Sequence, residues 1–325
     1  MPRIVQFTHP GQEHGPDRTN PLQKSWNTGP HGRKFMRCVG DHVDASNRLV
    51  CNKPLLFWGE WEPPSDVKQL SNGTEKLNPK WLHEPYVPAE IPSDSSSSCS
   101  PTKISCQSGC GKGKSLQNTD PFVFEDAFRY FVCKQAKKGR EDKEPFKQAT
   151  GMSELDKGSM ILFGSTSGKK GQEFFQLDTV FIVADWIEYD PSNLKPLLSS
   201  PKVSRFYDQL VISKVFPQPA SHSINLRLYF GATVENPSEG MYSFSPSRVC
   251  EAEPRGFPRV RLQNMDFLTN NLNSAPKFTP KGDRTKIKRA WLDIRQESRK
   301  QGCVEGVRFS VEKEHQRSVS SPHDF

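Results

Sequence analysis

Residues 55–64 (LLFWGEWEPP) combine aromatic and acidic side chains at a spacing that could recognise or act on a base. If this stretch is a strand, Trp58, Glu60 and Glu62 point to one face, because successive side chains alternate between the two faces. One wall would then hold an indole ring that stacks on a base and two carboxylates that accept hydrogen bonds from its edge. Trp61, on the other face, is a second candidate base-binding residue. The alternative is structural, with Trp58 in the core and the carboxylates paired with Lys or Arg.

A second group of residues could perform acid–base chemistry. His31 and Arg33 lie upstream of that stretch, and His9 follows the predicted first strand. Histidine titrates near neutrality and a carboxylate can orient its ring, so a His, an Arg and paired carboxylates can form an acid–base site. The candidate acid, base and substrate-clamping residues are His31, Arg33, Glu60, Glu62 and Asp120. Alternatively, the histidines are solvent-facing loop residues, since the sequence does not show that these side chains meet.

Positive charge concentrates near the C-terminal end of the sequence. Residues 277–317 contain 12 Lys and Arg against 6 Asp and Glu, which accounts for most of the chain's net charge of +8. Within them, the spacing of Ile287, Ala290, Trp291 and Ile294 predicts an amphipathic helix over 285–301, which Gly302 ends. The opposite face carries the candidate phosphate-binding residues Lys288, Arg289, Arg295, Arg299 and Lys300. A charged, solvated face of a surface helix is the alternative interpretation.

The elements that must position these residues are mostly strands. Apolar and β-branched runs bounded by turn residues predict strands at 3–8, 54–61, 159–164, 174–183, 223–231 and 304–311. The run at 122–135 predicts a strand leading into a helix, because its apolar residues recur at helical spacing. Short strands, long loops and few helices indicate an α+β fold, with a β-rich mixed or antiparallel sheet curled towards a barrel and a few peripheral helices.

Composition limits the organisation of the chain. We expect one globular domain formed by residues 1–90 and 116–315, with a disordered Ser/Pro/Gly/Lys-rich insertion at 91–115 and a disordered tail at 316–325. No apolar run approaches the length of a membrane span and no secretion signal is evident, so a cytoplasmic location without membrane contact is expected. Cys99, Cys106 and Cys110 lack the paired two-residue spacing of a zinc site, so no metal is predicted. Cofactor and oligomeric state stay open.

Two parts of the sequence resemble known families. Lys157 and Gly158, followed by an apolar strand, a glycine-rich loop and a second strand ending in valines, resemble the central barrel hairpin of PUA-like domains at residues 156–185. The resemblance extends to their EVE and YTH branch, and it implies a barrel that receives modified bases in an aromatic cage. The blocks NTDPFVF, GAT and GMYSF, at 118–124, 231–233 and 240–244, are similar to bacterial and phage nucleotide-modification-associated domains, a resemblance that assigns no catalytic residue.

Three functions follow as hypotheses. The first is a nucleic-acid- or nucleotide-associated protein in which the basic helix contacts phosphates and an aromatic pocket at Trp58 or Trp61 receives a base. The second is an enzyme that acts on a nucleotide or nucleobase, by glycosidic-bond cleavage or group transfer, through the acid–base candidates. The third is a protein-interaction module whose charged helix is only a solvated face.

Overall fold

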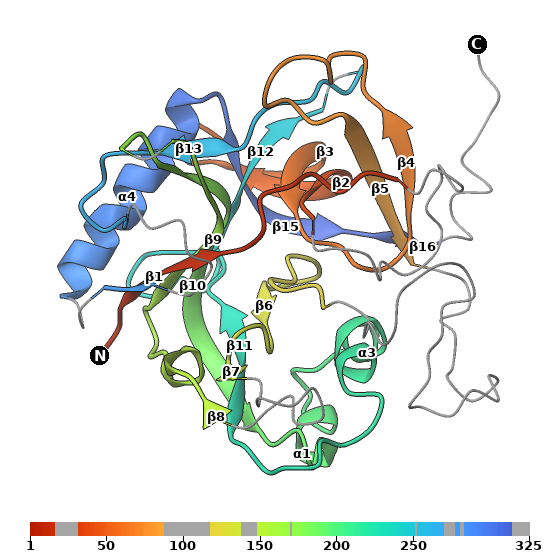
Figure 1. The fold of residues 1–325 in the computed structure, drawn as a ribbon, viewed down its shortest axis with the longest axis vertical. Coiled ribbons are helices and arrows are strands. Elements are labelled where there is room, and N and C mark those ends of the chain that lie inside the picture. Colours follow the sequence, from red (N-terminus) through yellow and green to blue (C-terminus); the bar gives the residue numbers. More distant parts are fainter. Residues whose placement is uncertain are drawn as a thin grey trace.

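The computed structural model describes residues 1–16, 32–87, 118–137, 148–169, 171–250, 252–269, 277–279 and 283–313. The predicted insertion at 91–115 and the predicted tail at 316–325 lie outside these residues, and so does His31. Two seven-stranded sheets make up most of the described chain (Figure 1). The predicted fold class, a β-rich α+β protein with a curled sheet, is confirmed.

The first sheet is built around the β9–β10 hairpin, which confirms the hairpin predicted at residues 156–185. Its strands, in spatial order, are β14 (Lys277–Phe278), β1 (Ile4–Thr8), β9 (Met160–Ser167), β10 (Phe174–Tyr189), β11 (Leu226–Gly231) and β6 (Arg129–Tyr130), and β13 (Val260–Leu262) also pairs with β10. β1 and β9 run parallel, whereas the other pairs are antiparallel. The sheet is therefore mixed.

The second sheet contains a closed ring of strands. Its order is β15 (Val304–Ser310), β12 (Ser245–Val249), β3 (Leu49–Gly59), β2 (Lys34–Val43), β5 (Trp81–Val87) and β16 (Glu312–Lys313), with β4 (Ser65–Gln69) paired to β5. β15 also pairs with β2, so β2, β3, β12 and β15 close on one another. Closing a sheet on itself removes its unpaired edges. A two-stranded sheet of β7 (Ala136–Lys137) and β8 (Gln148–Ala149) completes the strands of the described residues.

Two hydrophobic cores lie on opposite faces of the central strands. In β3, Phe57 belongs to one core and Trp58 to the other, and in β9 Phe163 and Leu162 divide in the same way. Strands buried on both faces read as continuous apolar runs because no side of the pleat meets water. This is why these strands were recognisable in the sequence.

Helices are few and peripheral. The longest, α4 (Arg284–Lys300), buries the predicted Ile287, Ala290, Trp291 and Ile294, and Gly302 follows it with φ of 78°. Short helical segments occur at η2 (Gly151–Glu154), α1 (Lys195–Leu198), α2 (Arg205–Tyr207), η3 (Asp208–Ile212) and α3 (Ser213–Val215). No helix within the described ranges is long and apolar enough to span a bilayer.

The helix predicted within residues 122–135 is absent from that segment, all of which the structure describes. The segment contains β6 and turns, and its apolar residues Phe122, Phe124, Phe128 and Phe131 are all buried in one core. The apolar spacing suggested a helix, but an irregular backbone can also direct these aromatic side chains into the core. Hydrogen bonds to Asp120 hold this backbone in place. Aromatic contacts such as that of Phe122 with Tyr207 fix the segment.

Candidate functional site

Five ionisable side chains converge where strands of the two sheets begin and end. His9 directly follows β1, Arg33 directly precedes β2 and Glu60 directly follows β3. Cys133 lies in the turn between β6 and β7. Asp178 is the extra residue where the β9–β10 register shifts, a β-bulge that turns its side chain towards Arg33. We call this group, His9, Arg33, Glu60, Cys133 and Asp178, the polar cluster.

Arg33 is the central cation of the polar cluster. Its guanidinium forms an ion pair with Glu60 and a second one, Nε to Oδ2 at 2.8 Å, with Asp178. A second cation, Arg259, lies 3.8 Å from the other Asp178 oxygen and donates hydrogen bonds to Ser165 Oγ and Gln176 Oε1. All four charged side chains are almost fully buried. Buried charges are costly unless they are paired, so this arrangement exists only because each charge has a partner.

His9 connects the ion pair to the thiol. Its Nδ1 contacts Glu60 and lies 2.8 Å from Arg33 Nη2, while its Nε2 lies 3.8 Å from Cys133 Sγ. The two contacts of Nδ1 require opposite tautomers, because Glu60 only accepts and needs a proton on Nδ1, whereas Arg33 only donates and needs a lone pair there. In the tautomer with the proton on Nδ1, Nε2 carries the lone pair and faces the sulfur. This is the order of nucleophile, base and orienting carboxylate that nucleophilic enzymes use.

Burial keeps the thiol and the imidazole neutral. It lowers the pKa of His9 from 6.5 to about 4, and the opposing attraction of Glu60 does not restore it. Burial also raises the pKa of the Cys133 thiol well above its usual range, with a further contribution from the negative charges of Asp120 and Glu60. At neutral pH the pair is thus a thiol beside a neutral base, rather than a thiolate beside an imidazolium.

The turn that carries Cys133 has an unusual backbone. Lys134, the next residue, has φ of 60°, in the left-handed region that residues with a β-carbon seldom adopt. Its ammonium group donates a 2.6 Å hydrogen bond to the carbonyl of Thr8 and lies 4.7 Å from the ring centroid of Phe7. Cys133 and Lys134 are partly exposed, so the polar cluster reaches the surface at this turn. Six other non-glycine residues of the described ranges also have positive φ.

Asp120 holds the same turn from the inside. Its carboxylate accepts hydrogen bonds from the backbone N–H groups of Phe131, Val132 and Cys133, at 2.8, 2.9 and 2.8 Å. Its own N–H donates to Glu60 Oε2 at 3.1 Å. Burial raises the pKa of Asp120 to about 7, although the three N–H donors oppose the shift. Asp120 therefore touches the backbone of the thiol residue and the carboxylate that orients His9.

Neighbouring polar groups extend the site. Lys34 donates to the carbonyl of Trp61, and burial lowers its pKa despite the attraction of Glu62 and Glu60. The backbone N–H of Glu62 donates to Thr119 Oγ1 at 3.0 Å. Both side-chain amide atoms of Asn118 are buried and have no hydrogen-bond partner within the described part of the chain. Other buried side-chain atoms of the described residues, such as Thr8 Oγ1 and Ser238 Oγ, are also unsatisfied.

Both tryptophans are buried. Trp58 is packed between Phe35 and Arg259, and its Nε1 donates to the carbonyl of Phe257 at 2.8 Å. Trp61 is fully buried and donates to the carbonyl of Pro64. Both indoles have apolar neighbours and a satisfied N–H, so they serve the two cores. The structural alternative considered for Trp58 describes both residues.

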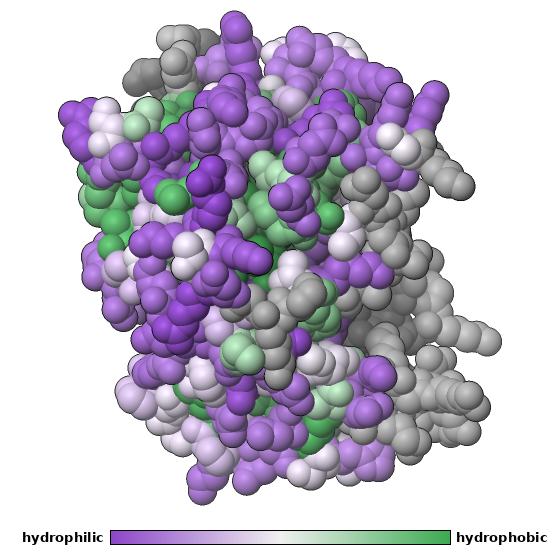
Figure 2. Space-filling model, turned by 90° about the vertical axis from the view of Figure 1, so that its left-hand side faces the viewer, coloured by the Kyte–Doolittle hydropathy of each residue, from purple (hydrophilic) through white to green (hydrophobic). Residues whose placement is uncertain are grey.

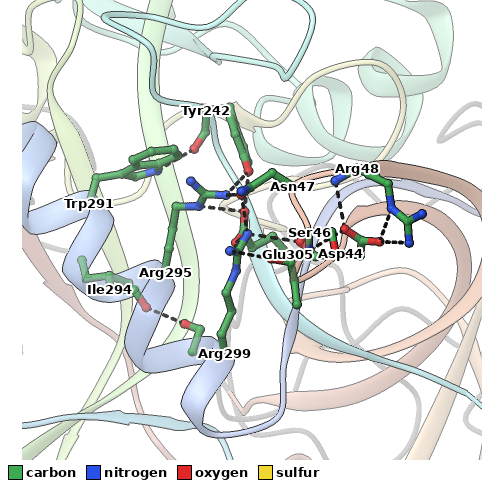
Figure 3. A network of polar contacts seen from close by, with 12 residues as sticks. Asp44, Ser46, Asn47, Arg48, Tyr242, Trp291, Ile294, Arg295, Arg299 and Glu305 are labelled. Atoms are coloured by element: carbon green, nitrogen blue, oxygen red, sulfur yellow. Dashed lines mark hydrogen bonds and ion pairs between the residues drawn. The ribbon is translucent and has the colours of Figure 1, made fainter.

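The predicted phosphate-binding residues of α4 divide into two groups. Arg295 and Arg299 both pair with Glu305, whose side chain is completely buried, at 2.9 and 2.7 Å (Figure 3). They also donate to Asn47 in the β2–β3 turn, so they attach the helix to the second sheet. The exposed residues are Lys288, Arg289 and Lys300, of which Arg289 pairs with Asp293 and Lys300 with Glu297.

Of the predicted acid–base residues, the structure brings Arg33, Glu60 and Asp120 together. Glu62 lies beside them through Thr119, and His31 is outside the described residues. His9, which the sequence offered beside His31 as a possible acid–base histidine, is the histidine in the cluster. Cys133, Asp178, Arg259 and Lys134 were missed, and the signal for Asp178 was an acid within an otherwise apolar strand.

No grouping of His, Cys, Asp and Glu that could hold a metal ion occurs among the described residues. Cys99, Cys106 and Cys110 lie outside them. Comparison of the chain with protein-family models gave no match, and comparisons with curated proteins and with solved structures likewise gave none. The function is therefore inferred from the geometry of the site.

Proposed function

We propose that this protein is an enzyme in which Cys133 attacks an electrophilic carbon of the substrate, with His9 as the base and Glu60 as the carboxylate that orients His9. The observation that carries the proposal is the position of the His9 ring, which has one nitrogen at the thiol and the other at Glu60. The dense burial of ionisable groups around the ring supports it, because buried groups of this kind cluster at catalytic sites.

The chemistry suited to this arrangement is hydrolysis or transfer of an acyl-type group. The sulfur of Cys133 bonds to the carbonyl carbon while its proton moves to His9 Nε2. The leaving group departs with that proton, which leaves a thioester. Water or an acceptor then attacks the thioester, gives a proton to Nε2, and the sulfur recovers a proton as the carbon–sulfur bond breaks.

We further propose that the substrate carries a nucleotide or nucleobase. Asn118 lies two residues before Asp120, and its buried amide has no partner among the described residues. A side-chain amide offers one acceptor and donors side by side, which matches the paired edge of a nucleobase. The net charge of +8 also favours an anionic substrate.

The test is covalent labelling by an activated ester such as p-nitrophenyl acetate, followed by mass spectrometry of the peptides. We expect acetyl transfer to Cys133 that falls at least about tenfold in His9→Gln, since a positioned base contributes a factor of that size or more. The exposed Cys51 serves as the internal control. Labelling that ignores Cys133, or that proceeds equally in His9→Gln, would contradict the proposal.

A second candidate function is polyanion binding by the outer face of α4. Arg284, Lys286, Lys288 and Arg289 line one surface hollow with Glu239 as its acidic residue. Cations at the beginning of a helix oppose the helix dipole, so helix stability does not explain their position. Figure 2 views the molecule from the side on which α4 lies, and hydrophilic side chains dominate that face. Phosphate contacts from Lys and Arg would suit a nucleic acid.

A further inference from the structure

We propose that Asp120 is a positioning residue that sets the distance between the Cys133 thiol and His9 by holding the Cys133 turn and Glu60 at the same time. The inference rests on the proposed function, because it assigns Asp120 to the same thiol site. Asp120 touches neither the sulfur nor the imidazole in the contacts described above. It would act on the thiol through the backbone of the Cys133 turn, and on His9 through the side chain of Glu60.

The hydrogen bonds at the turn fix the backbone that carries the thiol. Three successive N–H groups, from Phe131 to Cys133, point at one carboxylate, with the first on Oδ1 and the other two on Oδ2. Hydrogen bonds to an ionised acceptor are about twice as strong as neutral ones. Three of them from consecutive residues fix the peptide planes directly before the Cys133 side chain.

Asp120 is also connected to Glu60. The N–H of Asp120 donates to Glu60 Oε2, while Glu60 Oε1 contacts His9 and Arg33. One residue therefore links the turn of the nucleophile to the carboxylate that orients the base. Movement of Asp120 would shift both members of the pair, although the sequence separates His9 from Cys133 by 124 positions.

The charge of Asp120 changes within the physiological range. Burial raises the pKa of its carboxyl group to about 7, and Glu60 acts in the same direction. The other titratable groups that interact with it are Cys133, Tyr130, Tyr189 and Tyr207, whose pKa values are all raised, so they stay uncharged near pH 7. Above pH 7 the turn is held by an anion, and below pH 7 by a weaker neutral acceptor.

The experiment compares two reactions of Cys133 in Asp120→Asn. Acetylation by p-nitrophenyl acetate needs the aligned His9, whereas alkylation by iodoacetamide needs only the thiolate. Loss of the Asp120 charge removes one cause of the raised thiol pKa. We therefore expect acetylation to fall about tenfold while alkylation stays equal or rises. Asp126→Asn, at an exposed carboxylate that pairs with Arg129, is the control and should change neither.

Hydrogen exchange gives a readout that does not depend on catalysis. The amides of residues 131–133 should exchange about tenfold faster in Asp120→Asn at pH 8, and their chemical shifts in the unmodified protein should titrate near pH 7. If acetylation depends on His9 but not on Asp120, the inference is wrong and the proposed function stands. If acetylation is independent of His9, the proposed function is wrong. Unchanged exchange of the three amides and the absence of an inflection near pH 7 would overturn the positioning role by themselves.

Discussion

The Nε2 atom of His9 lies 3.8 Å from the sulfur of Cys133, and the other nitrogen of the same ring contacts Glu60. The three residues come from the end of β1, the β6–β7 turn and the end of β3, so both sheets contribute to the arrangement. Neither the thiol nor the imidazole is charged at neutral pH. The geometry suits a base that takes a proton only when the thiol attacks.

Glu60→Gln should destabilise the protein strongly. The substitution leaves the buried Arg33 with Asp178 as its remaining anionic contact and replaces the carboxylate beside His9 by a neutral amide. Breaking a buried ion pair costs about 3–5 kcal/mol because a charge is left uncompensated. Urea denaturation measures the loss. Glu239→Gln, at the exposed pair with Arg284, is the control and should change stability by less than about 0.5 kcal/mol. Equal effects of the two substitutions would rule out a charge-dependent cluster.

The pH dependence of stability should reveal His9 and Asp120 as opposing groups. The folded-state pKa of His9 is lowered to about 4, so stability rises between about pH 4 and 6.5, where only the unfolded chain binds the proton. The pKa of Asp120 is raised from 3.8 to about 7, so stability falls across that window, where only the folded chain binds the proton. The His9→Gln variant should keep only the fall of stability with rising pH that Asp120 causes. The Asp120→Asn variant should keep only the rise that His9 causes. Denaturation midpoints at several pH values check the signs, and parallel profiles in both variants would contradict them.

Much of the fold could be predicted from the sequence, but only part of the site. Strands buried on both faces and the apolar stripe of α4 are local patterns, so β9, β10 and α4 were found within a few residues at one end or both. The thiol site is non-local, because residues far apart in the chain meet only after two sheets pack. Arg33, Glu60 and Asp120 were predicted as candidate acid, base or substrate-clamping residues from their residue types. The role of Cys133 carried no local signal.

The burial of the two indoles could not be predicted from the sequence for a related reason. A Trp beside two acids is compatible with a base-stacking wall and with a buried strand end, and only the packing of Phe35 and Phe257 around Trp58 decides between them. Similarly, Arg295 and Lys288 look alike on a helical wheel. They differ because Arg295 pairs with the buried Glu305 on β15, whereas Lys288 is exposed. Only a short turn joins α4 to β15.

Trp58→Phe should lower stability without affecting nucleotide or nucleic-acid binding. The smaller ring leaves a cavity and removes the hydrogen bond to the carbonyl of Phe257, at a cost of about 1–3 kcal/mol. Thermal unfolding measures the first effect and fluorescence anisotropy with a labelled oligonucleotide the second. A selective loss of oligonucleotide affinity in this variant would instead restore the base-stacking hypothesis.

Substitutions on the two faces of α4 should differ in their effect on folding stability. Arg299→Ala deprives the buried Glu305 of one cation and should cost about 1–3 kcal/mol of stability. Lys288→Gln, at an exposed residue, should change stability by less than about 0.5 kcal/mol. Urea denaturation of both variants provides the comparison. A larger loss in Lys288→Gln would contradict the division of the helix.

Neutralising the outer face of α4 tests the second candidate function. In the double variant Lys286→Gln and Lys288→Gln, the salt dependence of duplex DNA binding should weaken by about 0.9 in log–log slope for each phosphate that the protein no longer neutralises. Lys53→Gln with Lys76→Gln, at exposed positions in β3 and the β4–β5 loop, is the matched control. Absence of binding at low salt, or equal slopes in both double variants, would contradict polyanion binding by α4.

The most direct test of the thiol site is the tautomer of His9, measured by nitrogen-15 NMR at pH 7. We predict a neutral ring with its proton on Nδ1, held by Glu60, and an unprotonated Nε2 facing Cys133. The ring should stay neutral down to about pH 4. A neutral ring with its proton on Nε2 would leave no base for the thiol and would contradict the proposed role of His9.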